Sequence, residues 1–91
     1  MMIHRRGGWL QAKVGDAYIM MSADSGDYIG LSEVGSRIWE MIEAPQDFDT
    51  LCTLLEEEFE VAPDVCRAEV ESFLRVLAEN EAVTLDPPLP T

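Results

Sequence analysis

The chain has 91 residues, of which 47% are hydrophobic and 26% are charged, a composition typical of one small globular domain and not of a disordered segment. Eighteen acidic residues against six basic ones give a formal net charge of −12. This charge argues against nucleic-acid binding, which depends on Lys and Arg displacing counterions from phosphates. The N-terminal stretch MMIHRRGGWLQAKVG lacks the apolar core of a secretory signal and no run is long enough to span a bilayer, so we expect a cytoplasmic protein that does not enter a membrane.

The acidic charge is concentrated in the second half of the chain. Between Glu40 and Glu81 there are thirteen acidic residues and only two basic ones, Arg67 and Arg75. Such a surface would attract a basic partner, or it would act only as a solvated face that keeps the protein soluble. The charge alone does not decide between these two interpretations.

The first half of the chain is predicted to form three antiparallel strands. In WLQAKV, Leu10, Ala12 and Val14 alternate with Gln11 and Lys13, the period-two pattern of a strand that buries one face. A Gly-Asp turn leads into AYIMMS, and ADSG forms a second turn into DYIGL. We expect a three-stranded meander, which needs other elements packed on one face to be stable.

The second half is predicted to form three helices. Ser32 is a suitable N-cap for the first helix, Asp47 caps the second, and Pro63 stands in the first turn of the third. Asn80 is expected to close the third helix in the left-handed conformation. The apolar residues at helical spacing are Val34, Ile38, Met41 and Ile42, then Phe48, Leu51, Leu54, Leu55 and Phe59, then Cys66, Val70, Phe73, Leu74 and Leu77.

A short strand is expected over residues 82–85, before a Pro-rich tail at 87–91. We therefore assign residues 1–86 to a single α+β domain. Its expected architecture is winged-helix-like, with a three-stranded antiparallel sheet followed by a three-helix bundle and a short C-terminal strand. A winged helix would suggest DNA binding, but the helix in the place of the recognition helix carries more acidic than basic residues.

No residue pattern predicts catalysis or metal binding. The sequence has no Gly-rich phosphate loop, no nucleophile near a base and no metal-ligand spacing, so we expect a protein that is not an enzyme and has no cofactor. Cys52 and Cys66 are expected to be free thiols that pack as small hydrophobic residues. His4 is expected near a mobile terminus, and Trp39 is expected to anchor the core.

The stretch YIGLSEVGSRIWEMIE, the turn at Pro45, the segment FDTLCTLLEEEFEV and the segment CRAEVESFLRVLAENEAV together resemble the PqqD family of peptide-modification chaperones. These proteins are also called precursor-peptide (RiPP) recognition elements. The resemblance extends over about Trp9 to Leu85 and is closest to the stand-alone members of lasso-peptide biosynthesis. It implies a non-catalytic protein that binds the leader segment of a ribosomally made precursor peptide and presents it, in trans, to a leader protease and a macrolactam synthetase.

The resemblance also implies how the leader binds. It would add as a strand to the third strand, DYIGL, and place apolar side chains in a cleft beside the third helix. Gly30 would let a second backbone approach closely, although a bulge or a fold constraint would explain this glycine equally well. Tyr28 and Ile29 must face opposite sides of the sheet, and the sequence does not say which one faces the core. The implied peptide-binding residues are Asp27, Tyr28, Ile29, Gly30, Leu31, Cys66, Arg67, Val70, Glu71, Phe73 and Leu74.

Two other functions stay open at this point. The protein would be a general acidic interaction or regulatory module if it binds a basic folded partner with strong salt dependence. It would be a chaperone of a different pathway if the enzyme that receives the leader is a radical-SAM peptide-modifying enzyme.

Overall fold

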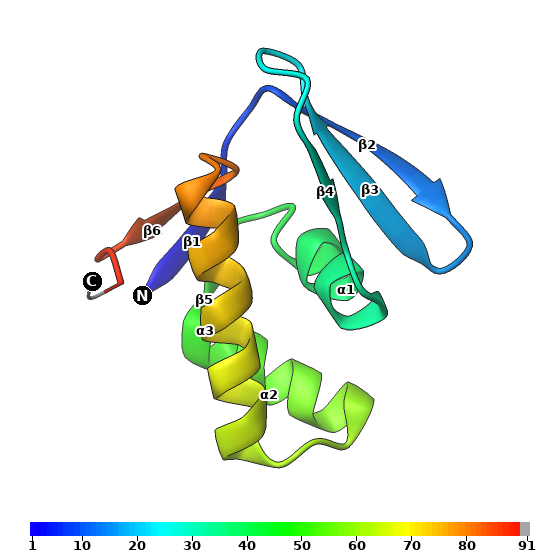
Figure 1. The fold of residues 1–91 in the computed structure, drawn as a ribbon. Helices are drawn as coiled ribbons and strands as arrows, with labels where there is room; N and C mark the ends of the chain where they lie inside the picture. Colours follow the sequence, from blue (N-terminus) through cyan, green and yellow to red (C-terminus); the bar gives the residue numbers. More distant parts are fainter. Residues whose placement is uncertain (90–91) are drawn as a thin grey trace.

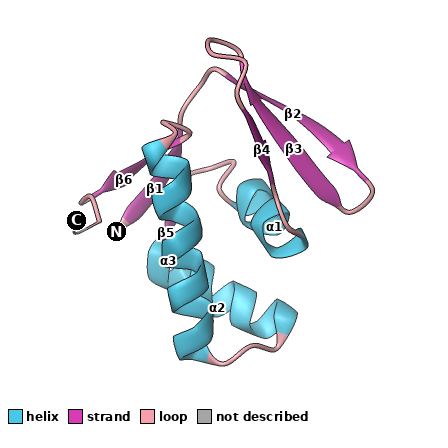
Figure 2. Cartoon of the chain, in the orientation of Figure 1, coloured by secondary structure: helices cyan, strands magenta, loops and turns pink. Residues whose placement is uncertain are grey.

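A computed structural model describes residues 1–89 and has an α+β fold with three helices and two small sheets (Figures 1 and 2). No helix in this range is long and apolar enough to cross a bilayer. The last two residues of the predicted Pro-rich tail lie outside the described range. The elements in chain order are β1 (Met2–Arg5), β2 (Trp9–Val14), β3 (Ala17–Ser22), β4 (Tyr28–Gly30), α1 (Glu33–Met41), β5 (Gln46–Asp47), α2 (Phe48–Phe59), α3 (Pro63–Glu79) and β6 (Val83–Asp86).

The predicted three-stranded meander is present as an antiparallel sheet in the order β2-β3-β4. Gly15, with φ of 63°, supplies the left-handed residue of the tight turn between β2 and β3. In the register of the sheet, Met21 of β3 lies opposite both Leu10 of β2 and Tyr28 of β4. Residues that lie opposite one another share a face of the sheet, so Leu10, Met21 and Tyr28 all lie on the same face.

The prediction that Leu10, Ala12 and Val14 face the core is wrong. Leu10 is 57% exposed and Val14 is 61% exposed. The other face of β2 is turned to α1, where the side-chain oxygen of Gln11 accepts a hydrogen bond from the indole N–H of Trp39. Met20, which lies opposite Gln11, is fully buried. Alternation in a sequence indicates that the two faces of a strand differ, but the packing of the helices decides which face they cover.

A second sheet, in the order β5-β1-β6, is not predicted by the sequence. Its central strand β1 places the buried Ile3 opposite Leu85 of β6 and Gln46 of β5. His4 lies in the same strand opposite Thr84, so the expectation of a mobile terminus is wrong. The four residues of β1 are too few to show a period, and their partners are distant in the sequence. The predicted C-terminal strand is confirmed as β6.

The predicted helix starts are confirmed. The Ser32 hydroxyl oxygen accepts a hydrogen bond from the backbone N–H of Gly35 at 3.0 Å. A carboxylate oxygen of Asp47 accepts from the backbone N–H of Thr50 at 3.2 Å, and Pro63 occupies the first position of α3. These groups satisfy or remove backbone donors that have no partner within the first turn of a helix.

The predicted left-handed end of α3 at Asn80 is wrong. Asn80 has φ of −91°, and both its backbone N–H and its side-chain Nδ2 donate to the carbonyl of Val76, at 3.1 and 2.8 Å. The left-handed residue is Glu81, with φ of 59°. Ala82 N then donates to the carbonyl of Leu77 at 2.8 Å. This compact turn leads α3 directly into β6.

The core lies where the three helices meet the two sheets. Trp39 is only 2% exposed, and Cys52 and Cys66 are buried free thiols, as predicted. Helix α2 packs with α3, while α1 packs on β3 and α3 packs on β6. These contacts do not confirm a three-helix bundle or a winged-helix arrangement, because the helices pack on sheets as well as on one another.

Candidate functional site

Strand β4 offers an open edge. It pairs with β3 on one side, and the described residues place no strand on its other side. Leu31 N donates to the carbonyl of Tyr18 at 2.9 Å, and the carbonyl of Asp27 accepts from β3 at 2.9 Å. Because alternate residues of an antiparallel strand bond to the same neighbour, the backbone N–H and C=O groups of Tyr28 and Gly30 point to the open edge.

Gly30 is not required by the fold of the described chain. Its φ is not in the left-handed range, and a Cβ at this position would meet no atom within 4 Å. The alternative of a local fold constraint is therefore not supported. Gly30 lies opposite Ile19, so its missing side chain leaves the face of the sheet turned away from α1 open at the end of β4.

The two residues before Gly30 face opposite sides of the sheet, and the structure decides which side each faces. Tyr28 is 71% exposed and lies opposite Met21, on the face turned away from α1. Ile29 lies opposite the fully buried Met20 and packs against the core. Of these two side chains, only that of Ile29 helps to anchor β4 to the core.

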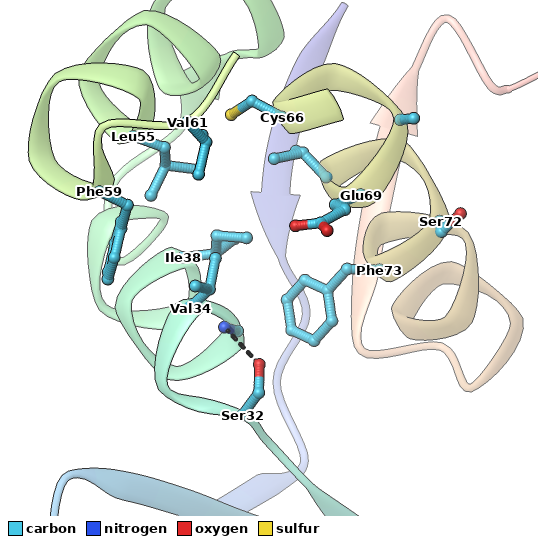
Figure 3. Close-up of a pocket in the computed structure, with 13 residues that line it drawn as sticks. Ser32, Val34, Ile38, Leu55, Phe59, Val61, Cys66, Glu69, Ser72 and Phe73 are labelled. Atoms are coloured by element: carbon cyan, nitrogen blue, oxygen red, sulfur yellow. Dashed lines mark hydrogen bonds between the residues drawn. The ribbon is translucent and has the colours of Figure 1, made fainter. Parts of the chain in front are cut away.

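A cleft of about 520 Å³ begins where β4 ends (Figure 3). It is bounded by the first turns of α1, the end of α2 with the loop that follows, and one face of α3. Figure 3 shows Val34 and Ile38 on one side of this space and the ring of Phe73 on the other. The lining residues are Ser32, Val34, Gly35, Ile38, Leu55, Phe59, Val61, Cys66, Ala68, Glu69, Val70, Ser72 and Phe73.

The lining of the cleft is mostly apolar, and Glu69 is its one charged residue. Figure 3 shows the carboxylate of Glu69 directed into the space between the helices. Burial raises the pKa of Cys66 and raises the pKa of Cys52 behind it to about 11, so both thiols stay neutral and neither is an activated nucleophile. The described residues contain no group of three or more His, Cys, Asp or Glu placed to hold a metal ion.

The structure brings together part of the predicted site. Cys66, Val70 and Phe73 line the cleft from α3. Leu74 is fully buried, and Leu31 is buried where β4 leads into α1. These two residues support the walls of the cleft from within the core.

The side chains of Arg67 and Glu71, which were predicted to contact the leader, are directed away from the cleft. A guanidinium nitrogen of Arg67 lies 2.8 Å from the carboxylate of Asp49, and the group stacks 5.1 Å from the centre of the Phe48 ring. Arg67 is therefore directed to α2. Glu71 pairs with Arg75, one turn further along α3, at 3.3 Å. Neither Arg67 nor Glu71 is among the residues that line the cleft.

The sequence interpretation missed the contributions of α1 and α2 to the cleft. Glu69 shares one face of α3 with Cys66, Val70 and Phe73, at positions i, i+3, i+4 and i+7, so helical spacing contains the signal for it. Nothing in the local sequence indicates that Val34 would face this helix, because α1 and α3 meet only in the folded chain.

The chain superposes with a TM-score of 0.80 on TbiB1 in complex with the TbiA(beta) leader peptide, with 26% sequence identity over 88% of this chain and 93% of the other. It superposes with a TM-score of 0.79 on lasso peptide synthetase B1 complexed with the leader peptide, over 91% of this chain and 98% of the other. At 17% identity the second likeness establishes the fold alone.

No curated protein sequence is significantly similar to the chain. The family model of coenzyme PQQ synthesis protein D (PqqD) matches residues 17–83, from the start of β3 to the start of β6. That range includes β4, its open edge, and every residue that lines the cleft. Since the match covers well over half of the sequence, the chain belongs to the PqqD family.

Proposed function

We propose that this protein binds the leader segment of a ribosomally made precursor peptide and has no catalytic activity of its own. The observation that carries this proposal is the open edge of β4, which leads directly into an apolar cleft. An unpaired strand edge is a template for another strand, and a cleft beside it can hold alternate side chains of that strand. Both similar structures described above were solved with a leader peptide.

In the proposed mode the leader adds to β4 as a fourth strand. The backbone groups of Tyr28 and Gly30 form the hydrogen bonds, which give affinity without regard to sequence. Leader side chains that point to α3 enter the cleft, where apolar lining selects apolar groups and Glu69 offers an acceptor to a donor group. Because a leader is disordered before binding, ordering it offsets part of this affinity, and we expect Kd values of about 1 µM or below.

The outer face of the sheet supports a further step, in which the bound leader is presented to a leader protease. Leu10, Val14, Ile19 and Tyr28 are all exposed there, on the face that α1 does not cover. A leader strand added to β4 would extend this face with its own outward side chains. A protease that contacts the face would then bind the loaded protein more tightly than the empty one. We place this step, and the macrolactam synthetase that follows it, in the cytoplasm.

The test is a fluorescence-polarisation titration of a labelled leader, taken from the precursor peptide encoded beside this protein. Gly30→Pro removes the outward N–H of the edge, so we expect affinity to fall by about tenfold or more. The matched control is Gly30→Ala, which keeps the N–H and has open space for its methyl group. Circular dichroism checks that both variants fold.

Two results would contradict the proposal at different levels. Absence of binding to every nearby leader at about 50 µM protein would refute leader binding itself. Wild-type affinity in a folded Gly30→Pro variant would refute strand addition at β4 while leaving leader binding intact.

A further inference from the structure

The proposed leader site lies between β4 and α3, and these two elements are associated with different sheets. Strand β4 is part of the sheet β2-β3-β4, whereas α3 packs on β6 of the sheet β5-β1-β6. Figure 1 shows these sheets as separate units, joined by the chain that runs from β1 to β2. The separation of β4 from α3 therefore depends on what fixes one sheet relative to the other.

Two stretches of chain connect the sheets: one runs from β4 through α1 to β5, and the shorter one runs from β1 to β2. The shorter one is a weak constraint. It consists of Arg6, Gly7 and Gly8, and two consecutive glycines allow many backbone conformations. Arg6 N is anchored to the carbonyl of Ala82 at 2.9 Å, which holds the start of this segment to the sheet that contains β1. Its other end carries the sheet β2-β3-β4, so this segment by itself leaves the position of that sheet to α1 and to side-chain packing.

The two sheets share one apolar core, in which Ile3 of β1 and Met20 of β3 are buried, and three side chains add a polar link between the sheets. The guanidinium carbon of Arg5, in β1, lies 4.0 Å from the centre of the Trp39 ring in α1, and its Nη2 donates a hydrogen bond to the carbonyl of Trp39. The indole N–H of Trp39 donates in turn to the side-chain oxygen of Gln11 in β2. We call this path, from one sheet through α1 to the other, the Arg5–Trp39–Gln11 relay.

A charged side chain is energetically unfavourable at the position of Arg5, between β1 and α1. Its Nε is buried and has no hydrogen-bond partner among the described residues, and burial lowers the pKa of the guanidinium. An apolar side chain of similar volume avoids the cost of removing a charge from water and is often as stable or more so. The presence of a cation here therefore suggests a benefit other than stability.

We propose that Arg5 is a positioning residue that, through Trp39 and Gln11, sets the separation of β4 from α3 and so determines which bound conformation of the leader fits. Arg5 is not among the residues that line the cleft, so it acts through the relay and not by touching the peptide. The effect on leader binding rests on the function proposed above. The separation itself is a property of the free protein and is measurable without a ligand.

The test is the distance between two spin labels in the free protein, measured by double electron–electron resonance. The labels are attached at Tyr28→Cys in β4 and Val76→Cys in α3, two positions that are 71% and 45% exposed. Cys52 and Cys66 are buried, with raised pKa values, so they do not compete for the label. In the presence of Arg5 we expect one narrow distance distribution.

Arg5→Met fills similar space without the charge or the donors, and we expect the distribution to broaden to at least twice its width. Arg5→Lys keeps a cation near the Trp39 ring and should restore part of the narrowing. Arg6→Met is the matched control, because the neighbouring Arg6 side chain is half exposed and pairs with Glu81 at 3.9 Å, at the surface. It should leave the distribution unchanged.

Leader binding provides the second measurement. We expect Arg5→Met to bind the labelled leader of the adjacent precursor at least tenfold more weakly, with a melting temperature equal to or above that of the wild type. If Arg5→Met does not fold, Gln11→Leu breaks only the last link of the relay and serves for the same comparison. If a folded Arg5→Met or Gln11→Leu variant keeps the narrow distance distribution of the wild type, the inference about Arg5 is wrong. If the wild type binds no leader, the proposed function is wrong, and the distance measurement in the free protein still stands.

Discussion

Phe73 of α3 packs directly on Gly35 of α1: a Cβ on Gly35 would lie 3.1 Å from Cε1 and 3.3 Å from Cζ of the Phe73 ring. Helices approach this closely only where one of them lacks a side chain. Both residues line the cleft, so this contact limits where the aromatic ring in the cleft wall can lie.

Gly35→Ala should therefore weaken leader binding by about fivefold to tenfold, ~1 kcal/mol, because the new methyl group displaces the Phe73 ring into the cleft. Alanine favours the helix by about 0.5–1 kcal/mol, so the free energy of unfolding should change by less than ~1 kcal/mol. The measurement is a titration of the labelled leader together with urea unfolding. In a double-mutant cycle with Phe73→Leu, the effect of Gly35→Ala should largely disappear, and equal effects in both backgrounds would contradict the contact.

Ser32→Ala should lower the free energy of unfolding by about 1 kcal/mol, since it removes the hydroxyl that caps α1 at Gly35 N. Ser32→Thr keeps a capping hydroxyl and should retain most of the stability. Urea unfolding of the three proteins at neutral pH measures the difference. Equal midpoints for the alanine and threonine variants would show that the cap does not stabilise the junction of β4 and α1.

The burial of Cys52 predicts a loss of stability in alkali. Its pKa is raised from 9.0 to about 11 in the folded protein, so between these pH values the thiolate forms in the unfolded chain first and favours unfolding. The associated stability is fully present below pH 9 and is lost as the pH rises towards 11. The melting temperature should fall less steeply over this range in Cys52→Ala, and parallel curves for the two proteins would exclude the contribution of this thiol.

Arg67→Glu should leave leader binding within about threefold of the wild type, because the Arg67 side chain is directed to Asp49 and Phe48 of α2 and does not line the cleft. The variant should be somewhat less stable, since it places two carboxylates together. Arg67→Lys is the control that keeps the charge. A tenfold loss of leader affinity with an unchanged melting curve would mean that the leader extends across α2.

Tyr28→Ala should separate leader binding from presentation. Because the side chain lies on the outer face and the leader pairs with the backbone in the proposed binding mode, we expect the affinity of the variant for the leader to change by less than about threefold. Cleavage of the loaded leader by the protease of the same pathway should fall by about tenfold or more, whereas Tyr28→Phe retains most of it. If cleavage by that protease is unaffected, it does not use this face.

The features that the sequence by itself determined are those whose signals are local. Ser32, Asp47 and Pro63 predict where the helices begin, because each satisfies or removes a backbone donor within one turn of itself. The meander follows from alternation and from Gly15 in its turn, and the stripe of Cys66, Val70 and Phe73 follows from helical period. The family was indicated by the resemblance of the stretch YIGLSEVGSRIWEMIE and the two helical segments after it, and that resemblance implied that a leader would add to β4.

Tertiary structure alone decided the rest, because it depends on which distant surfaces meet. The exposed face of β2, the strand β1 that pairs with segments far along the chain, and the packing of Phe73 on Gly35 have no local signature. The same is true of Arg5, which looks like an ordinary basic residue near the N-terminus until the fold places Trp39 beneath it. A residue's period and neighbours in the sequence predict its element, but only the packing of two elements determines which of its sides is buried and what it touches.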